Sequence, residues 1–154
     1  MKELTCCFTG HRIISKEDMP FIKDKIKEEA EALINKGILY FGAGGALGFD
    51  MYAAEAVLEL RNKYPSVRLV LVLPSRDYDN LWSDSQRKRY SAIRESADKI
   101  TYVEEKYKPG CMHKRNRHLV DHSSVCIAYI RKEKGGTYYT VKYAKEHGLK
   151  IINI

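Results

Sequence analysis

The sequence lacks the features that would place the chain in a membrane, in a fibre or outside the cell. No apolar run approaches the ~18 residues of a membrane span, and the first residues, MKELTCCFTG, show no charged region, apolar region and cleavage site of a secretion signal. The four cysteines include no CxxC pair, so neither a zinc ribbon nor a redox dithiol is indicated. We therefore expect a cytoplasmic protein that does not bind membranes.

The remaining composition is that of one globular domain spanning residues 1–154. Hydrophobic residues make up 44% and charged residues 31% of the 154 positions. The formal net charge of +7 is uneven, because ten Lys and Arg residues face four Asp and Glu between Ser85 and Arg117. This segment is either a solvated basic face or a positively charged binding surface for a phosphate-bearing partner.

The hydrophobic pattern alternates between strand-like and helix-like periods along the whole chain. Strands are expected at about 4–9, 38–41, 67–73, 100–103, 125–130 and 151–154, with Pro74 ending the third. Helices are expected between a cap at Asp18 and a stop at Gly37, and then at about 49–63, 83–97, 112–121 and 137–147. Strands alternating with helices predict an α/β fold, a Rossmann-like three-layer sandwich around a mostly parallel sheet of about six strands.

Glycine-rich and polar segments follow the strands at the edge where such sheets bind ligands. Gly10, His11 and Arg12 follow the first strand, GAGGALGFD follows the second, and KGGT follows the fifth. Glycines allow backbone N–H groups to approach a ligand, and a helix N-terminus adds a favourable dipole for an anion. We expect two amide cradles, one formed by Gly44, Gly45 and Gly48, the other by Gly135, Gly136 and Thr137, with Thr137 as N-cap or hydroxyl donor. The plainer interpretation is that the glycines only form tight turns.

Other side chains could complete such a site. Arg12 and Arg115 could neutralise phosphate, Asn116 lies beside Arg115, and Trp82 could cover a base. His118 and His122 have the i, i+4 spacing of zinc ligands, but no HExxH motif contains them, and the glycine run departs from the GxGxxG of dinucleotide sites. We therefore expect no metal and no cofactor.

These segments together resemble the SLOG superfamily, which gathers DprA-type and LOG-type Rossmann-like proteins. The resemblance is carried by TGHR, GGALGFDMYAAEA, LPSRDYDNLW, MHKRNRHLVDHS and GGTYYTVKYA, in this order and nearly end to end. It is closest to the YpsA-like branch of small bacterial proteins. The resemblance implies a pocket for a nucleotide-derived, phosphate-containing small molecule, and a homo-oligomer.

Two relatives within the superfamily suggest alternatives. LOG enzymes cleave nucleoside monophosphates, but placing Gly136 and Thr137 on the GT of their PGGxGTxxE signature puts Thr140 where the catalytic Glu belongs. Asp50 and Glu55 are the remaining candidates for the carboxylate of a nucleoside-monophosphate or nucleotide-sugar hydrolase. DprA-type proteins bind single-stranded DNA, and Leu47 stands where their GGARGID-like stretch carries a basic residue. Nucleic-acid binding through the basic segment is thus a less favoured alternative.

Overall fold

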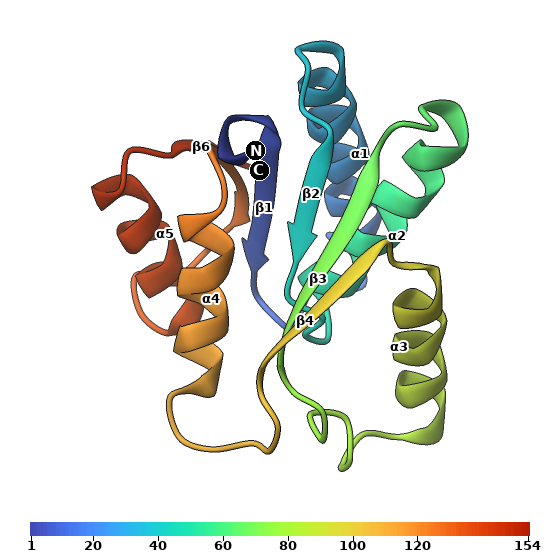
Figure 1. The fold of residues 1–154 in the computed structure, drawn as a ribbon, viewed down its shortest axis with the longest axis vertical. Coiled ribbons are helices and arrows are strands. Elements are labelled where there is room, and N and C mark those ends of the chain that lie inside the picture. The colour runs from blue at the N-terminus through green and yellow to red at the C-terminus, as the bar shows by residue number, and fades with distance from the viewer.

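Strands and helices alternate along the chain in the computed structural model, which describes residues 1–154 (Figure 1). The strands are β1 (Thr5–Gly10), β2 (Tyr40–Ala43), β3 (Arg68–Ser75), β4 (Lys99–Glu104), β5 (Val125–Tyr129) and β6 (Lys150–Asn153). The helices are α1 (Met19–Asn35), α2 (Phe49–Lys63), α3 (Asp84–Ser96), α4 (Cys111–Asp121) and α5 (Gly136–Glu146), preceded by a 3₁₀ turn, η1 (Lys2–Leu4). None of these helices is both long and apolar enough to cross a membrane.

The six strands form one sheet in the order β4-β3-β2-β1-β5-β6, and every neighbouring pair is parallel. This confirms the predicted Rossmann-like sandwich. The chain winds outward from β1 to β4 and then returns to place β5 on the other side of β1. Strand order therefore reverses between β1 and β5, which is where open parallel sheets bind ligands.

Helices cover both faces of the sheet (Figure 1). Side chains of α1, α2 and α3 join a core cluster of 25 buried residues on one face, and those of α4 and α5 join a cluster of 9 on the other. Alternation along β1 explains the division, because Cys6 and Phe8 enter the larger cluster and Cys7 the smaller. The face beneath α4 and α5 thus has the smaller core.

Strand β3 continues through Pro74 to Ser75, so the expectation that Pro74 ends it is wrong. The pairing of β2 with β3 stops at Leu71, whereas the pairing with β4 runs on to Ser75. Pro74 therefore lies where β3 has a neighbour on one side only, and a residue without an N–H is tolerated there.

Helix boundaries differ from expectation by small amounts. The capping box at Ser83 and Gln86 is present as predicted. Helix α5 begins at Gly136 with Gly135 as N-cap, so Thr137 is not the N-cap. Glycine at Gly135 has φ +92°, a conformation that disfavours a side chain and therefore a Thr or Ser cap at that position.

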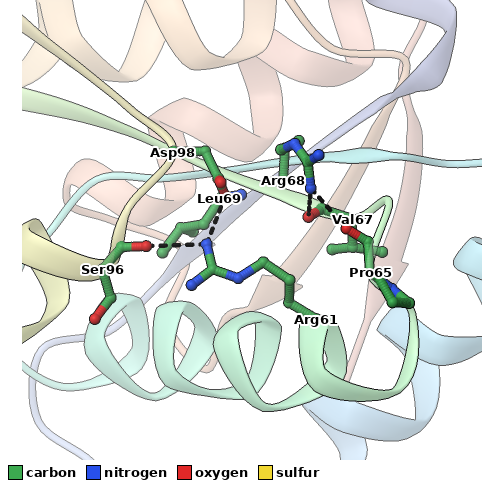
Figure 2. A network of polar contacts seen from close by, with 7 residues as sticks. All are labelled: Arg61, Pro65, Val67, Arg68, Leu69, Ser96 and Asp98. Carbon is green, nitrogen blue, oxygen red and sulfur yellow. Dashed lines mark hydrogen bonds and ion pairs between the residues drawn. The ribbon is translucent and has the colours of Figure 1, made fainter.

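A network of polar contacts lies at the amino end of β3 (Figure 2). Arg61 of α2 donates to the Ser96 carbonyl at 2.9 Å and to Asp98 at 2.8 Å. The same Asp98 oxygen accepts the Leu69 N–H at 2.8 Å. This network joins α2, β3 and the α3–β4 turn, and so holds the start of β3 in register.

Candidate functional site

One cavity of about 410 Å³ lies where strand order reverses, between the loops that follow β1 and β5. Four segments line it: the end of β1 and its loop, the β2–α2 turn, the first half of α4 and the start of α5. The lining includes nine residues singled out from the sequence: Gly10, His11, Arg12, Asp50, Arg115, Asn116, Gly135, Gly136 and Thr137. The two glycine-containing turns therefore do meet at one hollow.

Arg115 is the buried cation of this cavity, with 3% of its surface exposed. Its Nη1 donates to the Gly44 carbonyl, and its Nε donates to Asn116 Oδ1 at 2.7 Å. These bonds tie α4 to the β2–α2 turn across the carboxyl edge of the sheet. A Cβ at Gly44 would collide with the Arg115 guanidinium, so glycine is required there for the guanidinium to approach.

Asp50 is the buried carboxylate of the cavity wall, and its Oδ2 accepts the Ala46 N–H at 3.3 Å. Burial raises the pKa of Asp50 above its ordinary value, and the positive charge of Arg115 only partly opposes this effect. The wall thus places a carboxyl group with a raised pKa beside a guanidinium.

The β2–α2 turn is not the amide cradle that its glycines suggest. Its Ala46 N–H is taken by Asp50, and the Phe49 N–H at the start of α2 donates to the His11 carbonyl at 3.2 Å. Gly44, Gly45 and Gly48 do not line the cavity, although Ala46 does.

Packing accounts for the other two glycines of this turn. Gly45 has φ +73° and lies against the Leu73 side chain, whereas Gly48 has φ +82° and lies against the Arg12 carbonyl. A Cβ at either position would overlap these groups. The glycines therefore let the turn pack closely against β3 and the β1 loop. This packing holds the turn beside the cavity.

The start of α5 is the open amide cradle of the site. Gly136 is exposed, and a Cβ built there would meet nothing within 4 Å. The first intrahelical bond comes from Tyr139, whose N–H donates to the Gly135 carbonyl at 3.1 Å. The N–H groups of Gly136 and Thr137 precede that bond and have no partner within the helix, so they are free to bind an anion.

His11 joins the two loops at the reversal point. Its Nε2 accepts the Arg131 N–H at 2.8 Å, so the neutral ring carries its proton on Nδ1. Burial, together with the charges of Lys132 and Arg131, lowers the pKa of His11. We therefore assign His11 a positioning role at neutral pH and no charge toward a ligand.

Besides the three glycines of the β2–α2 turn, two residues singled out from the sequence, Trp82 and Glu55, lie outside the cavity. Trp82 does not line the cavity but packs edge-on against Tyr78 and Tyr90, with ring centroids 5.1 and 5.0 Å away. Glu55 lies on α2 outside the cavity and pairs with Arg89. Only Asp50, of the two carboxylates considered for hydrolysis, faces the cavity.

Several lining residues were missed by sequence reasoning: Phe8, Thr9, Ala46, Met112, His113 and Tyr139. Met112 and His113 precede Asn116 by four and three residues, which places them on the same helical face as Asn116. Tyr139 follows Gly136 by three residues on α5. A helical-face argument from Asn116 and Gly136 would have found these three.

The basic segment between Ser85 and Arg117 does not form one surface. Helix α3 covers one face of the sheet and α4 the other. Half of its ten cations are engaged in ion pairs with acidic side chains, namely Arg87, Arg89, Arg94, Lys108 and Lys114. The local charge excess seen in sequence is thus divided and partly neutralised.

Comparison with known proteins places the chain among bacterial relatives. The model of the YspA SLOG family matches residues 7–151. The prophage-derived protein YoqJ of Bacillus subtilis, described as uncharacterized, is 36% identical over 81% of both chains. A UPF0398 protein of Halalkalibacterium halodurans is 29% identical over 82% of this chain and 68% of its own.

Two solved structures share the fold. DNA processing protein A of Helicobacter pylori, in a structure described by its single-stranded DNA binding mode, superposes with a TM-score of 0.69 at 21% identity. The protein of the same name from Streptococcus pneumoniae gives 0.70 at 18% identity. Both matches cover 99% of this chain, which spans only 65% and 50% of those longer proteins.

Gly48→Ala tests whether the turn glycines serve packing. Gly148 has a similar φ of +79° but open space around a Cβ, so Gly148→Ala is the matched control. The control should lose about 1–2 kcal/mol of unfolding free energy from backbone strain alone. Gly48→Ala should lose about 1–3 kcal/mol more, because its Cβ meets the Arg12 carbonyl. Urea unfolding measures both, and equal losses would contradict the packing role.

Arg115→Met tests the link between Arg115 and Asp50. Loss of the bond to Gly44 should cost about 1–3 kcal/mol of unfolding free energy at neutral pH. The pKa of Asp50 should rise further, so that native Asp50 keeps its proton where the unfolded chain, with an ordinary pKa of 3.8, has released it. The stability of the variant relative to wild type should therefore fall with rising pH once native wild-type Asp50, whose pKa already lies above 3.8, has released its proton, and level off when Asp50 of the variant has released its proton too.

The double variant Arg115→Met/Asp50→Asn is the control for this pH dependence. Asn retains an oxygen for the Ala46 N–H but has no titrating group. The stability of the double variant relative to wild type should not show the fall with rising pH that is expected for Arg115→Met. A fall of the same size in both variants, measured by urea unfolding from pH 4 to 8, would exclude Asp50 as its source.

Proposed function

The chain belongs to the YspA SLOG family, and from this premise we propose that its cavity binds a nucleotide-derived small molecule through a phosphate group. The observation that carries the proposal is the meeting of an open helix N-terminus with guanidinium groups at the reversal of strand order. Backbone N–H groups at a helix start and planar guanidinium groups are both suited to phosphate oxygens.

Each wall has a part in this proposal. The α5 start, with Gly136 and Thr137, holds the phosphate. Arg12 is exposed and approaches from the β1 loop, and none of the ion pairs of the protein involves its guanidinium. Asp50 accepts a hydrogen bond from a ligand hydroxyl when ionised, and the neighbouring Arg115 guanidinium adds positive charge to the same wall.

The alternative of nucleic-acid binding has the fold of DNA processing protein A in its favour. A small ligand is better supported, because the site is a cavity of about 410 Å³ and the basic segment is split between opposite faces of the sheet. Such a volume lies in the range of small-molecule pockets.

Gly136→Asp tests the proposal without disturbing the fold. A carboxylate at the start of α5 is favourable for the helix and has open space around it, but it repels a phosphate. Gly136→Asn is the matched control of the same size without charge. Isothermal titration with AMP, ADP, ADP-ribose and inorganic phosphate gives the affinities.

Wild type should bind at least one of these probes, and Gly136→Asp should weaken that binding at least about tenfold, or 1.4 kcal/mol. Gly136→Asn should stay close to wild type. Absence of binding of every probe at millimolar concentration would count against the proposal, as would equal affinities of the two variants.

A second candidate, hydrolysis of a nucleoside monophosphate, is favoured by the placement of Asp50 alone. Asp50 lines the cavity and has a raised pKa, as a general acid requires. Chromatography of AMP incubated with the protein should then show free adenine, and Asp50→Asn should abolish its release while nucleotide binding persists. Intact AMP with wild type would reject the hydrolase.

A further inference from the structure

A second hollow of about 560 Å³ adjoins the cavity and lies between α4 and α5. We name it the α4–α5 groove; it is lined by His113, Asn116, Arg117, Tyr139, Thr140, Lys142, Tyr143 and Glu146. His113, Asn116 and Tyr139 line both the groove and the cavity. The two hollows therefore adjoin at these three side chains.

The groove carries unpaired positive charge. Arg117 of α4 and Lys142 of α5 line it from the two sides, and neither forms an ion pair within the protein. Glu146 is the one acidic residue of the lining. By contrast, Lys114 on the same helix as Arg117 is bound to Glu104 at 2.7 Å. Arg117 and Lys142 thus give the groove positive charge that no acidic side chain pairs with.

An aromatic side chain marks the junction of groove and cavity. Tyr139 is 58% exposed, and its ring meets the edge of His113 with centroids 6.2 Å apart. An exposed aromatic face of this kind suits a nucleobase, because every base has a flat face that stacks. Its position beside Gly136 places it next to the proposed phosphate seat.

Small and anchored side chains keep the groove open. Thr140 donates its hydroxyl to the Gly136 carbonyl at 2.8 Å, which keeps it against its own helix. The Tyr143 hydroxyl donates to Asp121 at 2.7 Å and so bridges the two helices. The bond between Tyr143 and Asp121 therefore ties α4 to α5 at the groove.

We propose that the α4–α5 groove is a second subsite, which takes a second phosphate-bearing nucleotide unit joined covalently to the unit in the cavity. The favoured ligand class is a linear dinucleotide. This inference rests on the proposed function, because it assigns the first unit to the cavity. Tyr139 stacks on a base at the junction, and Arg117 and Lys142 contact the second phosphate.

The experiment compares one unit with two. Isothermal titration uses AMP, the linear dinucleotide pApA and the hexamer (pA)6 on the full chain. In wild type, pApA should bind at least about tenfold more tightly than AMP, because the second unit binds at a high effective concentration once the first is seated.

Arg117→Gln should remove most of the advantage of pApA while leaving the affinity for AMP unchanged, since Arg117 lines only the groove. Lys145→Gln is the matched control: it also removes one positive charge, and it lies on α5 outside the groove. Its affinities for both probes should equal those of wild type.

The possible outcomes separate the two proposals. AMP binding with no gain for pApA would overturn the second subsite and leave the proposed function standing. Failure of AMP and pApA alike would overturn the second subsite, and it would overturn the proposed function as well if ADP, ADP-ribose and inorganic phosphate also fail to bind. Further tightening with (pA)6, together with a steep dependence on salt, would replace the dinucleotide with a nucleic-acid strand and overturn this assignment. Equal losses in Arg117→Gln and Lys145→Gln would show a general effect of charge and also overturn it.

Discussion

The burial of the Arg115 guanidinium is the constraint around which the carboxyl edge of the sheet is arranged. A buried cation must have its donors satisfied, and Arg115 meets this need through the Gly44 carbonyl and Asn116. The bond to Gly44 joins α4, on one face of the sheet, to the turn that begins α2 on the other. The two layers are thereby joined at the reversal of strand order.

Two helices begin near the cavity after similar glycine-rich segments, but they differ in whether their first N–H groups are already hydrogen-bonded. At α2 the N–H groups are engaged by Asp50 and by the His11 carbonyl. At α5 nothing lies within 4 Å of a Cβ at Gly136. The difference follows from the neighbours: the α2 start lies beneath the β1 loop, whereas the α5 start follows an exposed loop at the surface. Composition alone carries no information on which start is covered.

Much of the fold was predictable because periodicity and capping are local. The alternating pattern gave all six strands and five helices, and Ser83 with Gln86 marked the start of α3 correctly. The prediction that β3 ends at Pro74 was wrong, because a strand can contain proline where its neighbour has stopped pairing with it. Where β2 stops pairing with β3 is a property of the sheet and is not visible in the local sequence. For the same reason the clashes that require Gly45 and Gly48, with Leu73 and with the Arg12 carbonyl, could not be inferred from neighbours in sequence.

The two faces of the sheet have cores of unequal size, and the open hollows lie on the face with the smaller core. The face beneath α1, α2 and α3 holds the larger buried cluster. On this face the first N–H group of α2 is already bonded to the β1 loop. The face beneath α4 and α5 holds the smaller cluster, and there the helices leave both the free α5 start and the α4–α5 groove. Tyr139 and Asn116 line both hollows, and on this ground we propose that a ligand bound at the α5 start extends along α4 and α5. In this proposal, recognition belongs to the layer that contributes less to the core.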